Sequence, residues 1–206
     1  MTGYKVYVLF DGYSTIQGNI QTANCTCSLI TGPKNVIVDT MTPWDGARLL
    51  EALDHHNLKC EDVNYVVSTH GHADHVGNNN LFLNGMHVMG HSIFKHNTFY
   101  DHNFEEKPHY YIDNDNVSVF ASPGHTLDHV SVRVKSEDMG VVIIAGDLFE
   151  KEDDVFDAEI WKAAGSEAPS LQVLHRKKVL LEAAYIIPGH GPMFKVTDEM
   201  RQTVNE

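Results

Sequence analysis

The stretch His70-Gly71-His72-Ala73-Asp74-His75 places four side chains of the metal-ligand type within six positions. Imidazole nitrogens and carboxylate oxygens are the preferred protein ligands of zinc and related divalent metals. His70 and His72 lie two positions apart, so an extended backbone would direct both at one ion. Asp74 and His75 follow where the chain must turn, and we expect them to address a second ion. A lone His-x-His pair would be weak evidence, but four ligand-type residues this close together predict a metal site.

Four apolar runs along the chain stop at a polar side chain of ligand type. These runs end directly at, or within a short Gly-containing turn of, His70, His125, Asp147 and His190. Strand ends in one sheet can meet at one edge, and that edge is where α/β folds place their binding sites. We therefore expect one assembled pocket, whose candidate metal ligands are His70, His72, Asp74, His75, His125, Asp147 and His190.

Short β-branched runs dominate the rest of the sequence and predict strands. Residues 45–57 predict a helix with leucines at helical spacing and Asp45 as its N-cap. A second helix is expected from about residue 170, and a third just after His72. Strands with helices between and after them indicate an α/β class, and with no linker or repeat the chain is expected to be a single domain over residues 1–206. The predicted strands cover residues 4–10, 24–31, 36–39, 63–69, 117–121, 130–134, 141–145 and 185–187.

The composition is acidic and rich in histidine. The 206 residues include 14 His, with 28 Asp and Glu against 15 Lys and Arg, giving a formal net charge of -13. This balance argues against a broad surface for nucleic acid or anionic membranes, although bound metal could still make a local cationic site. No stretch is long and apolar enough to predict a membrane span, and no clear basic import run is present. A soluble protein of the cytoplasm, the nucleus or both is expected, and a homo-oligomer remains open.

The ordered motifs resemble those of the metallo-β-lactamase superfamily: His-x-His-x-Asp-His, a later His, a later Asp, and a last His in a Gly-His turn. The resemblance implies an αββα sandwich of two facing sheets with helices outside. It also implies that Asp147 bridges two metals, and that Asp39, after an early strand, orients a ligand histidine. The first metal would be held by His70, His72 and His125, and the second by Asp74, His75 and His190.

Such a centre predicts hydrolysis. A water shared by two divalent ions roughly 3.5–4 Å apart loses a proton near neutral pH, and the hydroxide attacks a carbon or phosphorus centre. Asp74 is the expected catalytic residue, because its carboxylate could orient the nucleophile by accepting a hydrogen bond. Zinc is the expected metal, with iron or manganese as alternatives. No serine-centred elbow motif is present.

Within the superfamily, the stretches at residues 69–78, 142–150 and 188–192 resemble the family of metallo-β-lactamase domain-containing protein 1. That resemblance implies an endoribonuclease that processes the 3′ ends of histone pre-mRNA, with RNA as the partner. The alternatives are a thioesterase or lactonase of the glyoxalase II kind, acting on a small ester or thioester, and a mononuclear-iron persulfide dioxygenase. A non-catalytic scaffold is the least favoured, because the ligand set is intact.

Most of the other charged residues, histidines and cysteines are predicted to have no role in the metal site. The acidic run after Asp147 (Glu150, Glu152, Asp153, Asp154 and Asp157) is expected to be a solvated loop, which would repel phosphate unless it faces away. Arg176, Lys177 and Lys178 are expected on a solvated helix face, and Cys25 and Cys27 as buried thiols on one strand. His129 is a possible outer partner of the ligand His125. No role is expected for His55, His56, His87, His91, His96, His102, His109 and His175.

Overall fold

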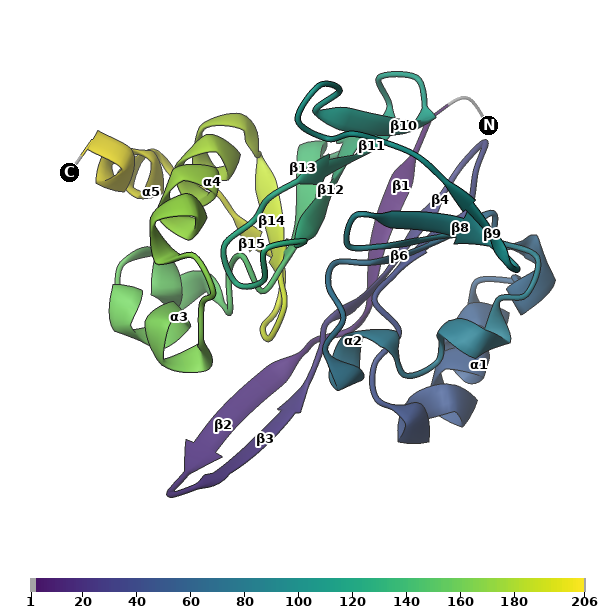
Figure 1. The fold of residues 1–206 in the computed structure, drawn as a ribbon, viewed down its shortest axis with the longest axis horizontal. Coiled ribbons are helices and arrows are strands. Elements are labelled where there is room, and N and C mark those ends of the chain that lie inside the picture. Colours follow the sequence, from purple (N-terminus) through teal and green to yellow (C-terminus); the bar gives the residue numbers. More distant parts are fainter. Residues whose placement is uncertain (1–2, 206) are drawn as a thin grey trace.

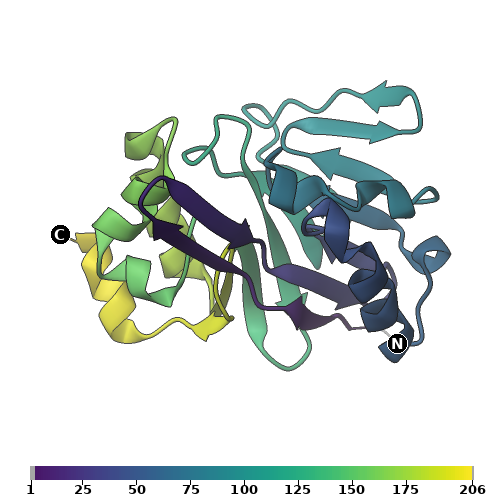
Figure 2. The same ribbon diagram turned by 90° about the horizontal axis from the view of Figure 1, so that it is seen from below.

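The computed structural model describes residues 3–205, and it contains two mixed sheets packed face to face with helices on their outer sides (Figures 1 and 2). The predicted αββα sandwich is therefore confirmed. The first sheet has the order β1-β4-β5-β6-β7-β8-β9. Its strands are β1 (Lys5–Phe10), β4 (Cys27–Thr31), β5 (Val36–Val38), β6 (Tyr65–Ser68), β7 (Met86–Met89), β8 (Ser92–Lys95) and β9 (Thr98–Tyr100).

The second sheet is formed by the later part of the chain, in the order β10-β11-β12-β13-β14-β15. A separate hairpin projects from the body of the molecule (Figure 1). The hairpin strands are β2 (Tyr13–Gln17) and β3 (Ile20–Asn24). The strands of the second sheet are β10 (His109–Asp113), β11 (Val117–Ala121), β12 (Val130–Ser136), β13 (Gly140–Gly146), β14 (Tyr185–Pro188) and β15 (Phe194–Lys195).

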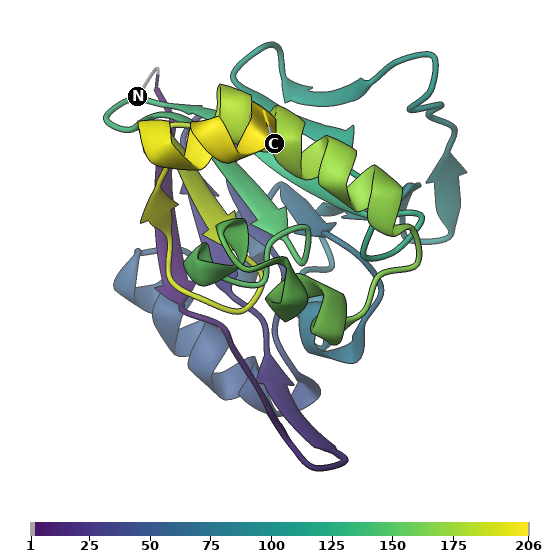
Figure 3. The ribbon, with the colours of Figure 1, turned by 90° about the vertical axis from the view of Figure 1, so that its left-hand side faces the viewer.

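Helices cover the outer face of each sheet. Leu49 and Leu53 of α1 (Gly46–His55) pack on the first sheet. Helices α4 (Pro169–Glu182) and α5 (Asp198–Gln202) pack on the second (Figure 3). Two shorter helices, α2 (Ala73–Val76) and α3 (Ala158–Ala164), lie in the connections. Among residues 3–205, none of the helices is both long and apolar enough to cross a membrane. Single 3₁₀ turns occupy Pro43–Asp45, Cys60–Asp62, Asn79–Leu81, Glu152–Val155 and Thr203–Asn205.

A valine- and isoleucine-rich layer between the sheets forms the main core, as expected for strands buried on one or both faces. Strands β5, β6 and β7 are mutually parallel, and so are β13 and β14. Strand β11 runs in the same direction as β13, because each is antiparallel to β12. The carboxyl ends of strands within each sheet therefore meet at one edge, and the loops that follow them carry the predicted ligands.

Most predicted strands are present with small changes at their ends, and two helices begin within a residue of their predicted starts. The predicted strand over residues 24–31 is interrupted at Cys25 and Thr26, because Thr26 N–H donates to the Gly189 carbonyl at 2.6 Å instead of joining a strand. Cys25 and Cys27 are free, buried thiols, as predicted, but Cys25 lies outside β4. Helix α2 begins just after His72, as predicted. The β2–β3 hairpin, strands β7, β8, β9, β10 and β15, and helices α3 and α5 were not predicted from the sequence.

Two expectations about charged residues were wrong. Arg176 does not lie on a solvated helix face: its guanidinium is buried, contacts Asp154 Oδ1 at 2.7 Å and lies 4.0 Å from the centre of the Phe149 ring. The acidic run is not wholly solvated either, because Glu150 and Asp154 are buried. Asp154 is buried because Arg176 neutralises it. The exposed members of the run are Glu152, Asp153 and Asp157.

The Arg176–Asp154 pair generates a stability prediction. Arg176→Met leaves the Asp154 carboxylate buried without its cation, and we expect the free energy of unfolding to fall by about 3–5 kcal/mol in urea denaturation. The matched control is Arg133→Met, which breaks a pair with Glu182, whose side chain is 45% exposed. That variant is expected to lose less than about 1 kcal/mol. Equal losses in the two variants would contradict the structural importance of the buried pair.

Candidate metal centre

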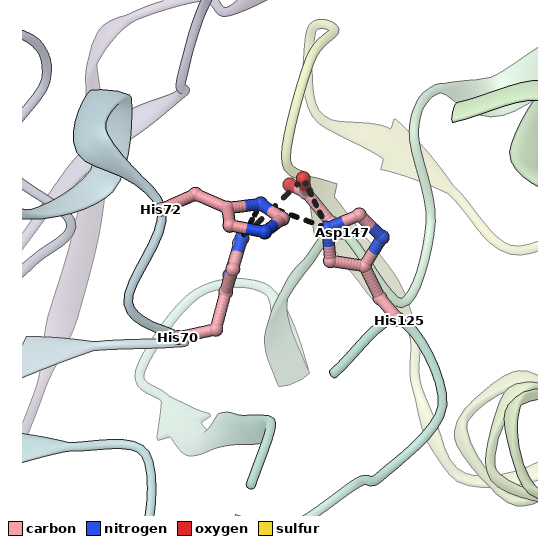
Figure 4. A group of neighbouring side chains, drawn as sticks. All are labelled: His70, His72, His125 and Asp147. Atoms are coloured by element: carbon pink, nitrogen blue, oxygen red, sulfur yellow. Dashed lines mark hydrogen bonds and ion pairs between the residues drawn. The ribbon is translucent and has the colours of Figure 1, made fainter. Parts of the chain in front are cut away.

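The predicted ligands converge where the strand ends of the two sheets face each other. His70 and His72 follow β6, His125 follows β11, and Asp147 follows β13. Figure 4 shows the three imidazoles directed toward Asp147. His72 Nδ1 lies 2.9 Å from His70 Nε2 and 3.1 Å from His125 Nε2. Asp147 Oδ2 lies 3.6 Å from His70 Nε2 and 3.3 Å from His125 Nε2.

A second group of ligand atoms adjoins the first and shares Asp147. His75 Nε2 lies 3.2 Å from Asp147 Oδ1, and His190 Nε2 lies 3.2 Å from Asp147 Oδ2. Asp74 Oδ2, on α2, lies 3.8 Å from His190 Nε2. The ligand atoms of His70, His72, His125 and Asp147 all lie within 4.8 Å of one another, and so do those of Asp74, His75 and His190, so each set could surround one ion. The structure thus brings all seven predicted residues together in the division expected for two metals, with Asp147 between them.

The second nitrogen of most of these imidazoles is held by a group outside the centre. His125 Nδ1 donates to the Gly165 carbonyl at 2.9 Å, and His190 Nδ1 lies 3.1 Å from the Asn24 carbonyl. His70 Nδ1 lies 3.1 Å from the Thr69 hydroxyl. A partner at one nitrogen fixes the tautomer and leaves the lone pair of the other nitrogen facing inward. The imidazoles are therefore oriented to bind cations.

Asp39 gives the clearest example of this support. Its carboxylate Oδ2 lies 2.9 Å from His75 Nδ1, and its Oδ1 accepts the Thr69 N–H at 2.8 Å. The structure places Asp39 where the sequence predicted an orienting residue. His129 was considered as an outer partner of His125, but its contacts are with other residues. Its Nδ1 lies 2.9 Å from Ser122 Oγ, and its ring stacks on His70 with centroids 5.3 Å apart.

Burial and the Asp147 carboxylate shift the pKa values of the histidines in the centre in opposite directions. Burial lowers the pKa of His70 and of His125, and it lowers the pKa of His129 to about 3. Burial also opposes a charge on His75 and His190, but Asp147 outweighs it, raising the pKa of His190 to about 9 and that of His75 well above its usual value. Those imidazoles in turn hold the pKa of Asp147 well below its usual range, against the effect of its burial.

The donor set fits a metal centre. His75 Nε2 and Asp147 Oδ1 are buried and lie 3.2 Å apart, but they do not form an aligned hydrogen bond with each other or with any other described residue. Unpartnered buried polar atoms are costly, and a bound cation would satisfy both. The inward-facing nitrogens of His70, His72 and His125 lie 2.9–3.1 Å apart. The other ring nitrogens of His70 and His125 already have partners outside the centre. A divalent ion resolves this crowding, because neutral imidazoles bind it through their lone pairs.

Close packing around the centre requires glycine at particular positions. A Cβ on Gly189 would overlap the Asp147 carboxylate, and one on Gly77 would overlap the backbone of residues 41–43. A Cβ on Gly71, by contrast, would have nothing within 4 Å. Gly189 and Gly77 are therefore required by space, whereas Gly71 is not.

Comparison with known proteins identifies the family. Residues 21–190 match the family model of the metallo-beta-lactamase superfamily. The chain is 38% identical over 195 residues to metallo-beta-lactamase domain-containing protein 1 of Xenopus laevis, covering 94% of this chain and 82% of the relative. The chain belongs to the metallo-beta-lactamase superfamily. It is therefore a metal-dependent hydrolase of that superfamily, and the His/Asp clusters are its candidate sites for divalent metal.

Other superfamily members show how far the similarity extends. The human protein of the same name is 37% identical over 173 residues, covering 83% of this chain and 63% of the relative, so this chain spans less than two thirds of that protein's length. A Thermotoga maritima structure described as a metallo-beta-lactamase has a TM-score of 0.71 at 18% identity, covering 94% of this chain and 99% of the other. At that identity the likeness shows the fold alone.

A pocket of about 360 Å³ opens onto the candidate metal centre. Two of its lining residues were missed in the sequence. Glu150, three positions after Asp147, was assigned to a solvated loop, and the apolar Leu148-Phe149 pair before it was the available signal for burial. Burial and the nearby Asp147 raise the pKa of Glu150 to about 8. Trp44 is 88% exposed and carried no sequence signal.

Asp39→Asn is predicted to weaken metal binding without unfolding the protein. Residue 39 has φ of 57°, a left-handed conformation that asparagine tolerates. The amide keeps an oxygen acceptor but loses the charge that supports His75. Losing such an outer partner lowers metal affinity roughly 10–100-fold. Calorimetric zinc titration of the apoprotein measures the effect, and unchanged affinity would contradict the assigned role of Asp39.

Gly189→Ala and Gly71→Ala form a matched pair at the two ends of the ligand set. The first displaces the Asp147 carboxylate, so we expect both ions to bind more weakly and the metal content after dialysis to fall below that of the wild type. The second adds a methyl group in open space and should retain its metal. Elemental analysis measures both, and full metal content in Gly189→Ala would refute the packing argument.

Proposed function

We propose that this chain is a dinuclear metal hydrolase that cleaves phosphodiester bonds in single-stranded RNA. The observation that carries the proposal is the set of seven ligand-type residues opening into a pocket with an exposed tryptophan beside it. The similarity to metallo-beta-lactamase domain-containing protein 1 covers most of the chain, and the RNA substrate is the one that the resemblance of the sequence motifs to that family implies. Histone pre-mRNA 3′ ends are the proposed natural substrate, and zinc is the proposed metal.

The residues of the pocket have different proposed roles in hydrolysis. Divalent ions bound there would supply an activated nucleophile and neutralise charge on the substrate. Asp74 lines the pocket with its side chain 20% exposed, so its carboxylate can accept a hydrogen bond from the attacking water and orient it. His70, His72 and His125 would hold the first ion, and His75 and His190 the second, with Asp147 contacting both groups.

Trp44 supplies a feature suited to nucleic acid. Its ring is 88% exposed beside the metal pocket, on the 3₁₀ turn that precedes α1. An exposed ring next to a hydrolytic centre can stack on an unpaired base, and such stacking contributes about 1–3 kcal/mol per base. It would hold single-stranded RNA with the neighbouring phosphate near the metals.

A second candidate function is hydrolysis of a small ester, lactone or thioester. The described residues that line the pocket include Asp74, Asp147 and Glu150 but no lysine or arginine, so this lining offers a phosphate no permanently charged side chain. The Bacillus cereus N-acyl homoserine lactonase is 24% identical over 165 residues, covering 75% of this chain and 65% of the lactonase. An uncharged acyl substrate suits such a pocket.

The test compares His72→Ala and Trp44→Ala with the wild type on single-stranded RNA and on a panel of lactones and thioesters. His72 is exposed, so His72→Ala is expected to keep the fold and lose turnover of every substrate. Trp44→Ala is expected to raise KM for RNA roughly 10–100-fold with little change for small esters. The matched histidine control is His55→Ala, at the exposed end of α1, which should behave as the wild type.

Two outcomes decide between the candidates. RNA left intact by protein carrying two metals per chain would refute the nuclease proposal, and turnover of a lactone or thioester by that same sample would establish the second candidate. Activity retained in His72→Ala would contradict the first metal site itself.

A further inference from the structure

Glu150 is an acidic side chain buried at the metal pocket, and one of its carboxyl oxygens lacks a hydrogen-bond partner among the described residues. Its side chain lines the pocket, the residue is 4% exposed, and Oε1 has no hydrogen-bond partner among the described residues. Burying an unpaired carboxylate is costly, so such a group is retained where a cation meets it. The pocket lining contains no lysine or arginine that could be this cation.

The backbone of Glu150 is fixed on both sides, which determines where its side chain points. The Glu150 N–H donates to Asp154 Oδ2 at 2.6 Å, and its carbonyl accepts the His190 N–H at 2.9 Å. Asp154 is in turn held by the buried Arg176. An ion pair between helix α4 and the 3₁₀ turn at Glu152–Val155 therefore holds Glu150 beside a predicted metal ligand.

The ligand atoms of Asp147, Glu150 and His190 all lie within 4.8 Å of one another, close enough to surround one ion. We propose that Glu150 is an additional ligand of the second metal, and that it raises the affinity of this site for Mn²⁺ or Fe²⁺ relative to Zn²⁺ above that of the first site. The proposal concerns the metals and holds for either substrate class.

The two sites then differ in chemistry. The first has three imidazoles with Asp147, a set suited to zinc. The second has the carboxylates of Asp74, Asp147 and Glu150 with two imidazoles, which is richer in oxygen and offers more ligands than tetrahedral zinc needs. Carboxylate oxygens and higher coordination numbers favour manganese relative to zinc, although zinc has the greater intrinsic affinity for most sites.

The test titrates the apoprotein with Mn²⁺ and with Zn²⁺ and counts the bound ions by elemental analysis and Mn²⁺ electron paramagnetic resonance. Glu150→Gln keeps the shape of the side chain and removes its charge. We expect this variant to bind Mn²⁺ at the second site at least 10-fold more weakly than the wild type and to keep its first-site zinc affinity. In a mixture of the two ions, its manganese content should fall.

Two further variants separate ligation from general charge effects. Glu152→Gln removes an exposed acid two positions away and should bind both metals as the wild type does. Glu150→Asp keeps the charge but withdraws the carboxylate by one methylene, so it should also lose second-site affinity. Thermal unfolding of each apoprotein confirms that it is folded.

Second-site Mn²⁺ affinity in Glu150→Asp equal to that of the wild type would overturn direct ligation, because charge alone would then suffice. Unchanged metal binding in Glu150→Gln with a raised KM for substrate would also overturn the proposal and assign Glu150 to substrate contact. Metal counts are independent of turnover, so failure of this proposal is distinguishable from failure of the nuclease assignment.

Discussion

The Asp147 carboxylate, surrounded by imidazoles, is the constraint on which the site depends. His70 reaches it from the loop after β6 of the first sheet and His75 from helix α2, whereas His125 and His190 reach it from loops of the second sheet. A buried carboxylate must be met by cations or hydrogen-bond donors, so the loops of both sheets have to close over one point. The missing side chain of Gly189 leaves the space that this convergence needs. Docking of the two sheets and assembly of the metal centre are thus a single structural requirement.

Residues outside the metal centre hold the ligand side chains in position. Asp39 and the carbonyls of Gly165 and Asn24 engage the outer nitrogens of three imidazoles, and each comes from a different part of the chain. Farther out, the Arg176–Asp154 pair fixes the backbone of Glu150. Side chains held by packing and hydrogen bonds lose little freedom when metal binds, which favours a defined ligand geometry over one that forms only with the ion. Helix α4, which contributes no residue to the pocket lining, therefore influences the pocket through the hydrogen bonds of the Arg176 and Asp154 side chains.

The sequence was most informative where local pattern and chemistry coincide. Apolar runs that end at His70, Asp147 and His190 predicted both the strands and the ligands, because the alternation of a strand and its termination are local properties. Glu150 and Arg176 were assigned to solvent because charged residues are usually exposed, and only the tertiary partner of each, a metal pocket or Asp154, explains its burial. The β2–β3 hairpin was missed because its strands are largely exposed and lack an apolar face. Local pattern therefore predicted the centre better than its surroundings.

The charge of the pocket follows from the number of carboxylates at the metals rather than from the net charge of -13. Two divalent ions bring about four positive charges, which the Asp74 and Asp147 carboxylates reduce to about two. If Glu150 also binds, about one remains. An RNA phosphate would then meet only a weakly positive pocket without lysine or arginine. Affinity for RNA would have to come mainly from stacking on Trp44, and its dependence on salt would be shallow, because few phosphates would be neutralised by protein cations. The same weak charge would let an uncharged ester enter freely, so the metal ligation of Glu150 bears directly on which substrate the pocket can favour.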